Sequence, residues 1–467
     1  MQTFQLFLDQ INDVLWTYIL IILLVGCAIY FTVKSRFVQF RMIGEMVRLL
    51  KDAVPGKGSA NQKHISSFQA FVVSLAARIG TGNMAGVATA ITVGGPGAVF
   101  WMWLIALLGS ASGFIESTLA QLYKRKAKEA FIGGPAYYME YGLGMRWMGI
   151  LFAILISITF GFAYNSVQSN TICAAWDKAF GIDAVWMGIL LTCFTLLVIF
   201  GGIHRIAKVS ETIVPFMAIA YFLIAIGIVI FNLPRIPEVL ESIFRNAFGW
   251  EQAVGGGAGA AVVQGIKRGL FSNEAGEGST PNAAATAHVT HPVKQGLIQS
   301  LGVFTDTLVV CSCTAFIILV SGVPMNTEET GIQLTQAAIT SQIGPAGNVV
   351  VAIAILLFAF SSIIGNYYYG EANIRFITRK PIFLHLYRLM VGSMVMLGSL
   401  MTLDLAWNLA DLTMACLTLC NLTAIIMLSR QAFFLLQDYR EQKRQGIKDP
   451  TFSKNQMPDI ADKLECW

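Results

Sequence analysis

The stretch SLAARIGTGNMAGVATA, residues 74–90, lies inside a long apolar segment. Its middle holds two glycines, a hydroxyl and an amide at Gly80, Thr81, Gly82 and Asn83, and Arg78 comes just before them. Irregular backbone persists in a bilayer only where it lines a cavity inside the protein, because each unpaired polar group costs several kcal/mol in hydrocarbon. An interrupted membrane helix is typical of a binding site for a small solute or ion. We therefore predict that residues 80–83 break a membrane helix and line such a site.

The composition is that of an integral membrane protein. Of 467 residues, 55% are hydrophobic and 13% are charged, whereas soluble domains have about 25% charged residues. Residues 1–13 contain two aspartates and no basic residue, and the apolar run after them is too long for a signal peptide. We expect a retained first helix. The eight cysteines mostly occupy apolar runs, and we interpret them as small buried hydrophobes.

Segments of about 20 apolar residues are long enough to cross a bilayer. By this criterion we predict eleven transmembrane helices, at residues 14–33, 68–92, 97–121, 147–173, 184–203, 211–232, 253–279, 296–321, 346–374, 383–402 and 405–429. The second and seventh are interrupted by glycine and polar residues. When the first helix is set aside, each interrupted helix begins a group of five. Because five is odd, the second group enters from the opposite side, as in the inverted repeats of secondary transporters.

The predicted fold is therefore an all-α membrane protein with one extra N-terminal helix and a 5+5 inverted repeat. We divide the chain into residues 1–67 (outside N-terminus, extra helix and cytoplasmic linker), 68–232 (first repeat), 233–429 (outward helix and second repeat) and 430–467 (cytoplasmic tail). Loops assigned to one side hold 26 of the 32 lysines and arginines, and the other side holds three. The positive-inside rule then puts the N-terminus outside and the C-terminus in the cytoplasm.

Three segments outside the spans also carry expectations. Residues 236–250 and 327–342 are amphipathic and outward, and we predict short helices over the outer mouth, either plain surface helices or gates. The charged tail from Arg430 is expected to be cytoplasmic and partly disordered.

The second interrupted segment is rich in charge. Gly255, Gly256 and Gly257 open it, and it continues through KRGLFSNEAGEG, residues 267–278. A charge at mid-bilayer costs about 2.5–3.5 kcal/mol, so Lys267, Arg268, Glu274 and Glu277 must face one another, water or substrate. Whether they form structural ion pairs or belong to a site is left open by the sequence.

Four more ionisable residues lie at membrane depth: Glu116, Asp306, Glu371 and Asp411. Each is a candidate functional residue. Glu116 and Glu371 are close to cytoplasmic ends, where interfacial pairing would be sufficient. Asp306 is deeper, and we expect Arg78 or Arg268 to be its partner.

Polar residues on two intact spans fit a buried pocket. One is the stretch YNSVQSN at residues 164–170, and the other is SSIIGNY at residues 361–367. The hydroxyls of Ser361 and Ser362 are neutral oxygen donors that suit a weakly held hard cation such as sodium. Alternatively, each serine bonds a carbonyl of its own helix.

Enzymatic patterns are missing from the sequence. It has no HExxH motif, no Ser–His pair within a span and no phosphate-binding loop, so we predict neither an enzyme nor an ATP-driven pump. A solute-gated channel and a membrane sensor for amino acids remain as alternatives.

At these residues the chain closely resembles the alanine or glycine:cation symporter family, of the amino acid–polyamine–organocation superfamily with the LeuT-type fold. The matching stretches are residues 74–83 with 86–88, 94–98, 133–135, 268–276 and 367–371. They occur in order over nearly the whole chain, including the extra first helix, and together they are highly specific.

The resemblance implies sodium-driven import of small neutral amino acids by alternating access, in a bacterial inner membrane. The partners implied are the amino acid, the coupling sodium ion and the lipid bilayer, with no nucleic acid and no inferable protein partner. By the family pattern, N–H groups of the first break would bind the substrate carboxylate, and the backbone at 269–272 would bind its ammonium, with Phe271 on its side chain. The substrate residues are Gly80, Thr81, Gly82, Asn83, Gln168, Gly269, Phe271, Ser272 and Asn366. The sodium ligands are carbonyls of Ala76, Ile79 and Phe358 and hydroxyls of Ser361 and Ser362.

One position departs from the family pattern. Many members carry Trp where this chain has Asn366, and Trp there would close a pocket sized for alanine. Asn is smaller and adds a donor and an acceptor, which favours a larger or amide-bearing substrate such as glutamine. Alternatively, Tyr367 or Phe271 fills the space. Proton coupling is a further alternative, which the lack of a carboxylate at the cation site disfavours.

Overall fold

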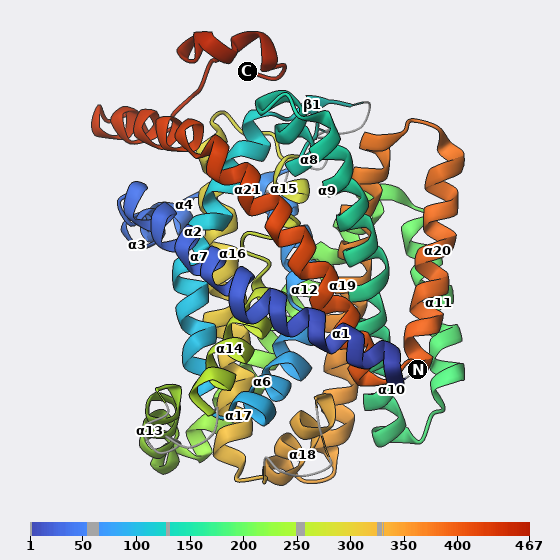
Figure 1. Cartoon of the computed structure of the whole chain (residues 1–467). Helices are drawn as coiled ribbons and strands as arrows, with labels where there is room; N and C mark the ends of the chain where they lie inside the picture. Colours follow the sequence, from blue (N-terminus) through green and yellow to red (C-terminus); the bar gives the residue numbers. More distant parts are fainter. Residues whose placement is uncertain (1, 54–64, 128–130, 249–256, 325–328, 330) are drawn as a thin grey trace.

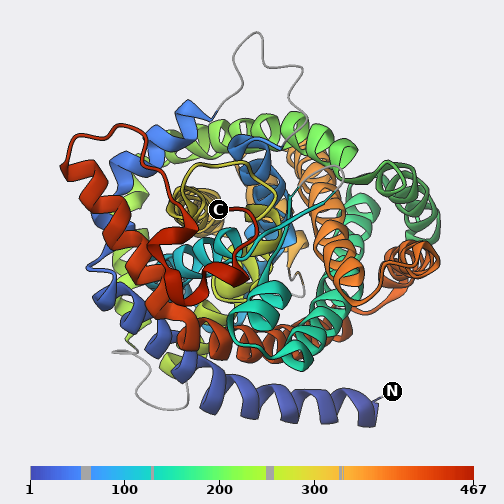
Figure 2. The ribbon, with the colours of Figure 1, turned by 90° about the horizontal axis from the view of Figure 1, so that it is seen from above.

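The computed structural model describes residues 2–53, 65–127, 131–248, 257–324, 329 and 331–467. The described chain is almost wholly helical, and its helices pack side by side into one bundle (Figure 1). The N-terminal helices α1 and α2 lie along the outside of this bundle, as the view from above makes clear (Figure 2). The described residues contain one small sheet, an antiparallel pair of β1 (Arg125–Lys126) and β2 (Phe131–Ile132).

The helices of the first half, with π-helical and 3₁₀ segments marked η, are α1 (Gln2–Val14), η1 (Leu15–Leu20), α2 (Ile21–Lys34), α3 (Val38–Arg41), α4 (Ile43–Asp52), α5 (Ser67–Arg78), η2 (Gly82–Gly86), α6 (Val87–Gly94), α7 (Gly97–Leu122), α8 (Pro135–Tyr137), η3 (Tyr138–Gly142), α9 (Arg146–Ile158), η4 (Thr159–Tyr164), α10 (Asn165–Phe180), α11 (Ala184–Ile199), α12 (Gly202–Phe231), η5 (Leu233–Arg235) and α13 (Ile236–Ala247). Those of the second half are α14 (Gly257–Asn273), α15 (Thr280–Ala284), α16 (Pro292–Val303), η6 (Phe304–Cys311), α17 (Ser312–Ser321), α18 (Ile332–Ile343), α19 (Ala346–Ile377), α20 (Pro381–Leu400), α21 (Leu403–Arg444), η7 (Lys454–Gln456) and η8 (Pro458–Lys463).

Eight helical stretches in the described residues are long and apolar enough to cross a membrane, and the bent pair α5 and α6 would make a ninth. The chain is therefore a multi-pass membrane protein. Two of the eleven predicted spans correspond to shorter helices, since α11 has 16 residues and the described part of the seventh span, α14, has 17. The count of eleven, the inverted repeat and the orientation stay predictions.

The break predicted in the first interrupted segment is confirmed. Helix α5 begins at a capping box formed by Ser66 and Gln69 and ends at Arg78, where Ile79 turns to extended backbone. The helix resumes at Gly82, bent by 49° from α5. This bend places the ends of two half-helices inside the bundle rather than at its surface.

The second break lies later than we expected. Helix α14 continues through Asn273, so residues 267–273 are helical, and the irregular backbone runs from residue 274 to 279. Three residues in it have left-handed backbone: Glu274, Gly276 and Gly278, with φ of 57°, 98° and 82°. Gly255 and Gly256, which were expected to open this segment, lie outside the described residues.

Glu116 binds the backbone of the second break. From the sequence we expected only an interfacial pairing for this residue. Its side chain is fully buried and accepts hydrogen bonds from the N–H groups of Gly276 (3.3 Å) and Gly278 (3.1 Å). Asn421 of α21 donates to the same carboxylate (2.8 Å) and to the Gly276 carbonyl (2.9 Å). Glu371, in contrast, pairs near its helix end with Arg375 and lies 3.8 Å from Arg388, in keeping with the expectation.

Both predicted short helices are present within the described residues, and their outward placement stays a prediction. The first is α13, and residues 249 and 250 of the predicted range lie outside the described part. The second is α18, and residues 327, 328 and 330 of its predicted range also lie outside the described part.

The expectation of a partly disordered tail is wrong. Helix α21 continues to Arg444, and the chain then folds back so that Phe452 and Leu464 are buried. The Phe452 N–H donates to the Thr290 carbonyl (2.9 Å), and the Trp467 indole donates to carbonyls at the end of α7. Widely spaced apolar residues among many charges gave no periodic signal, although each finds a place in the fold.

Candidate functional site

Five predicted cation ligands lie together where α19 packs on the end of α5. The Ser362 hydroxyl is 3.0 Å from the Ala76 carbonyl, 3.2 Å from the Ile79 carbonyl and 3.1 Å from the Phe358 carbonyl. The Ser361 hydroxyl is 2.8 Å from the Phe358 carbonyl and 3.5 Å from that of Ala76. Each serine thus contacts its own helix, as the alternative expected, and also reaches across to α5.

The chemistry of this oxygen cluster fits a hard cation. A hydroxyl has one proton to donate, so the Ser362 proton cannot serve three carbonyls at once. The cluster therefore has more acceptor oxygens than donors, and all five residues are buried. An excess of neutral oxygens without protons is the ligand set that alkali and alkaline-earth cations prefer.

Two N–H groups of the first break are directed at side-chain oxygens. The Gly80 N–H donates to Asn83 Oδ1 (2.8 Å), and the Thr81 N–H and hydroxyl donate to Gln168 Oε1 (2.9 and 2.6 Å). Gln168 comes from α10, so the structure brings this predicted residue to the break. The break is a place where backbone donors meet an acceptor from another helix.

An added side chain would be crowded at two positions of the break. A Cβ at Gly80 would lie 2.2 Å from the Ser362 hydroxyl oxygen, and a Cβ at Gly82 would lie 3.0 Å from the Phe271 ring and 3.1 Å from Ser272 Cα. The first break therefore touches α19 at Gly80 and the end of α14 at Gly82.

Asp306 joins the two breaks, and the expectation that it pairs with Arg78 or Arg268 is wrong. Its carboxylate accepts hydrogen bonds from Asn83 Nδ2 (2.6 Å) in the first break and from the Ser272 hydroxyl (2.7 Å) near the second. Its neighbour Thr307 also donates to it (2.9 Å). A fully buried carboxylate thus lies between two residues that we predicted to bind substrate.

Arg78 bonds to neutral groups instead, and its buried Nε has no hydrogen-bond partner among the described residues. Its guanidinium donates to the Thr280 hydroxyl (2.7 Å) and to the Gln299 carbonyl (3.2 Å). Arg78 therefore connects the end of α5 to the helix that follows the second break and to α16.

The cations of the second segment do form ion pairs, but with a distant partner. Arg268 contacts both oxygens of Asp411 (3.1 and 2.8 Å), and Lys267 Nζ is 2.7 Å from the same carboxylate. Glu274 instead accepts from the Ser279 hydroxyl (2.5 Å), and Glu277 accepts from the Tyr164 hydroxyl. The two basic residues thus tie α14 to α21.

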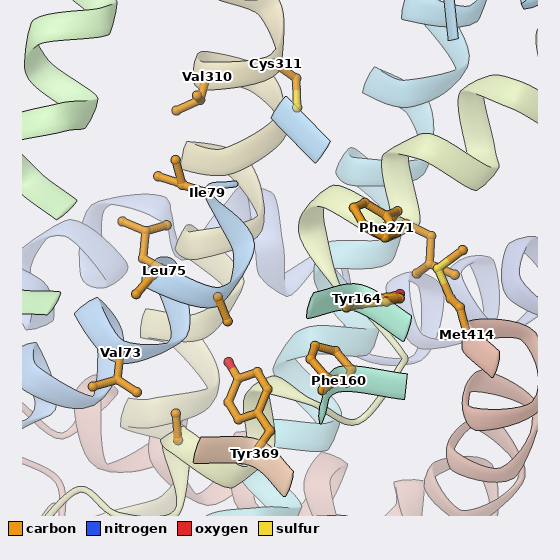
Figure 3. Packing of buried hydrophobic residues seen from close by; sticks show 14 of the residues in the cluster. Val73, Leu75, Ile79, Phe160, Tyr164, Phe271, Val310, Cys311, Tyr369 and Met414 are labelled. Carbon is orange, nitrogen blue, oxygen red and sulfur yellow. The ribbon is translucent and has the colours of Figure 1, made fainter. Parts of the chain in front are cut away.

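Aromatic rings form a column beside the breaks (Figure 3). Ring centroids are 4.7 Å apart for Trp407 and Phe271, 4.5 Å for Phe271 and Tyr164, 4.6 Å for Tyr164 and Phe160, and 5.3 Å for Phe160 and Tyr369. Phe271 therefore has ring neighbours on two sides. Such a column offers an apolar wall to a small side chain.

A cavity of about 670 Å³ lies above this column, between α1, α6, α14 and α21. Arg268, Trp407 and Asp411 line it, whereas Phe271 and the first break do not. Trp407 packs its ring under the Arg268 guanidinium, 4.1 Å away, and separates the cavity from Phe271. We did not predict Trp407, although its spacing of four residues from Asp411 puts both on one helix face.

Asn366 is fully buried, and only one of its two polar side-chain atoms has a hydrogen-bond partner among the described residues. Its amide nitrogen donates to Asn165 Oδ1 (3.0 Å), while its own Oδ1 has no hydrogen-bond partner among the described residues. The ring of Tyr367, a candidate for filling the adjacent space, stacks on Tyr387 with centroids 5.9 Å apart. Its hydroxyl bonds to Glu371 and Arg388, so Tyr367 is held by other partners.

A family model described as the sodium:alanine symporter family matches residues 1–454. The chain belongs to this family. It is 51% identical to the probable sodium/glutamine symporter GlnT of Bacillus subtilis over 98% of this chain and 94% of that protein. It is 44% identical to the putative sodium/proton-dependent alanine carrier protein YrbD of the same organism, over 96% and 94% of the two chains.

Solved structures extend the likeness to the fold. The symporter matches the crystal structure of a manganese transporter of Eremococcus coleocola with a TM-score of 0.54 over 88% of this chain and 87% of that one, at 14% identity. At this identity the match shows the fold alone. The protein is a sodium-coupled symporter with an all-α membrane fold, and not an enzyme.

We expect Gly82→Ala to weaken substrate binding while the symporter still inserts and folds. The added methyl group meets the Phe271 ring and the Ser272 backbone, which must separate to make room. Binding of labelled alanine and glutamine to the purified protein measures the effect, and elution volume in size-exclusion chromatography reports the fold. The matched control is Gly227→Ala, where a Cβ meets nothing within 4 Å. Wild-type binding by Gly82→Ala would contradict the position of the break in the site.

Proposed function

We propose that the symporter imports a small neutral amino acid together with sodium, which binds in the oxygen cluster of Ala76, Ile79, Phe358, Ser361 and Ser362. One observation carries this proposal. The Ile79 carbonyl faces Ser362, and the Gly80 N–H, which belongs to the same planar peptide group, faces Asn83 within the break. A cation that fixes this carbonyl therefore also fixes the N–H donors of the adjacent break.

Such a shared peptide group supports coupling between the ion and the amino acid. Coupling requires that each ligand favours binding of the other by the same free energy. Sodium at the cluster would hold the break in the form that binds a carboxylate. An amino acid bound there would in turn hold the Ile79 carbonyl toward the ion.

The predicted substrate residues supply both ends of a zwitterion. The N–H groups at Gly80 and Thr81 and the positive end of the following half-helix suit a carboxylate, and Gln168 is the acceptor that a carboxylate would displace. The last turn of α14 leaves carbonyls without helical partners, and these suit an ammonium group near Ser272. Gly269 lies one turn earlier, inside the helix, and packs on Ile105.

The driving force is adequate for accumulation. One sodium ion entering down about 100 mV releases about 2.3 kcal/mol, and a tenfold sodium gradient adds about 1.4 kcal/mol. Together they sustain a gradient of several hundredfold in the amino acid at one-to-one stoichiometry.

The proposal includes the arrangement in the membrane. Eleven helices with an inverted repeat, the N-terminus outside and the C-terminus in the cytoplasm of a bacterial cell, follow from the hydropathy and from the bias in basic residues. Two shorter helices, α11 and α14, would be the spans that complete the count.

Alanine and glycine are the primary substrates we propose, and glutamine is the alternative. The free Oδ1 of Asn366 supports the alternative, since an amide-bearing side chain could donate to it. The name of the glutamine symporter GlnT supports it as well.

Proton coupling is a second candidate, and Asp306 is the observation that favours it. This buried carboxylate touches Asn83 and Ser272, so adding a proton would change the bonds at both breaks. The relative YrbD is named for both sodium and protons.

Uptake of labelled alanine into proteoliposomes tests the function. We expect accumulation under an inward sodium gradient, and its collapse when potassium replaces sodium. Accumulation under an inward proton gradient in potassium, lost in Asp306→Asn, would favour the second candidate. Flux that only equilibrates would contradict symport.

We expect Ser362→Ala to raise the sodium concentration that gives half-maximal uptake by about tenfold, because removal of a cation ligand costs about one hydrogen bond to a charged group. The ranking of competing amino acids should stay unchanged. The control is Ser393→Ala on α20, an exposed serine whose hydroxyl bonds only its own helix. An unchanged sodium dependence would remove Ser362 from the cation site.

We expect Asn366→Trp to narrow the substrates to alanine and glycine, because an indole at this position would close the pocket in the way the family pattern implies. Competition of labelled alanine uptake by glutamine, asparagine, serine and glycine measures this. Asn366→Ala separates size from hydrogen bonding, since it keeps the space and removes the amide. An identical competition profile in all three proteins would take Asn366 out of the pocket.

A further inference from the structure

A basic hollow lies at one end of the pair formed by α2 and α21. It has a volume of about 210 Å³, and five cationic side chains line it: Arg36, Arg41, Arg440, Lys443 and Arg444. The first two come from the turn after α2 and from α3, and the other three come from the end of α21. Figure 1 shows α3 and α4 close to the end of α21. The hollow thus collects charge from two distant parts of the sequence.

The protein neutralises this charge only in part, since Lys443 lies 3.4 Å from Glu45 and Arg444 lies 3.8 Å from Glu441. Arg36, Arg41 and Arg440 have no ion pair or side-chain hydrogen bond with any described residue. Glu45, the nearest carboxylate on α4, is bound by Arg48 (2.7 Å) and Tyr439 (2.6 Å) and lies 3.4 Å from Lys443. Its hydrogen bonds to Arg48 hold the pKa of Glu45 at about 2, so its charge is already committed. Clustered positive charges repel one another, and a bound anion would offset this repulsion.

The backbone turns sharply beside the hollow. Arg36 and Phe37 both have left-handed backbone, with φ of 57° and 59°, and they turn the chain sharply out of α2. Phe37, Phe40, Ile43 and Val47 then expose large apolar side chains at helical spacing along α3 and α4. A helix with one basic and one exposed apolar face is typical of the interface between headgroups and acyl chains.

A separate apolar groove lies on η1 and α2 beside α21, and it shares no lining residue with the hollow. It has a volume of about 560 Å³ and is lined by Tyr18, Ile22, Gly26 and Tyr30 on η1 and α2 and by Ile426 on α21. Gly26 deepens the groove, since a Cβ there would meet nothing within 4 Å. Tyr30 also contacts Phe433 of α21, with ring centroids 6.1 Å apart, at the end of the groove nearer the hollow. From Gly26 to Arg36 is ten residues, or about 15 Å along a helix.

We propose that the hollow and the groove together bind one anionic phospholipid, with its phosphate among the five basic side chains and an acyl chain in the groove. Charge complementarity assigns the headgroup, because three arginines lack a counter-ion. The groove assigns the rest of the molecule, because its lining is apolar and includes the exposed side chains of Tyr18 and Ile22. Basic pockets between membrane helices at the bilayer surface are sites of this kind. The lipid would link the first helix of the chain to its last.

The test uses the full-length symporter purified in detergent, with the thermal unfolding midpoint and native mass spectrometry as readouts. We expect phosphatidylglycerol to raise the midpoint and to remain bound, and phosphatidylcholine to do neither. In Arg36→Gln/Arg41→Gln/Arg440→Gln, phosphatidylglycerol should bind about a hundredfold more weakly, as three lost surface charges imply. The matched control, Arg379→Gln/Lys380→Gln/Lys454→Gln, removes equal charge from positions outside the hollow and should bind as the wild type does.

A second variant probes the groove independently of charge. Gly26→Leu places a side chain in the groove, where its Cβ meets nothing within 4 Å, so it should weaken phosphatidylglycerol binding while the midpoint without lipid stays unchanged. Equal binding by the two triple variants would overturn the proposal in favour of general surface charge. If inorganic phosphate raises the midpoint as much as phosphatidylglycerol does, the proposal of a lipid is overturned and the hollow binds a free anion. If mass spectrometry detects a dimer that is lost in Gly26→Leu, the proposal is overturned and the groove binds a second copy of the chain.

Discussion

The backbone donors and acceptors left open by two broken helices are the constraint on which the structure depends. No water is available to them in hydrocarbon, so each must find a protein partner. At the first break the partners are Asn83 and Gln168, and at the second the N–H groups of residues 276 and 278 share the carboxylate of Glu116. These partners come from α7 and α10 as well as from the break itself. The positions of those helices are therefore set by polar contacts as much as by packing.

The same contacts join the two breaks into one unit. Asp306 accepts from both, Arg78 spans from the end of α5 to α15, and the Ile79–Gly80 peptide group serves the oxygen cluster on one side and the break on the other. A change at any of these groups is felt at the others through bonds of fixed geometry. An amino-acid symporter needs this property, because ion and solute must be carried together.

The sequence predicted what local chemistry determines and missed what distant residues determine. Glycines and polar residues within apolar runs located the first break, and the two serines pointed to α19 as the wall opposite α5. The partners of the buried charges were not predictable, because Arg268 and Asp411 are 143 residues apart and Asp306 reaches Asn83 across 223. The second break was placed too early because its charges preceded the residues with left-handed backbone. Phe452 and Trp467 showed that a charged tail can fold on a few apolar anchors.

The bond between α14 and α21 has a consequence for how the chain is made. Arg268 and Lys267 leave the ribosome 143 residues before Asp411 does, and at about 5–20 residues per second this interval is on the order of 10 s. During that time the nascent α14 holds two cations whose carboxylate partner among the described residues has not been synthesised. Because an unpaired charge at mid-bilayer costs about 2.5–3.5 kcal/mol, burial of α14 is less costly once the last span supplies Asp411.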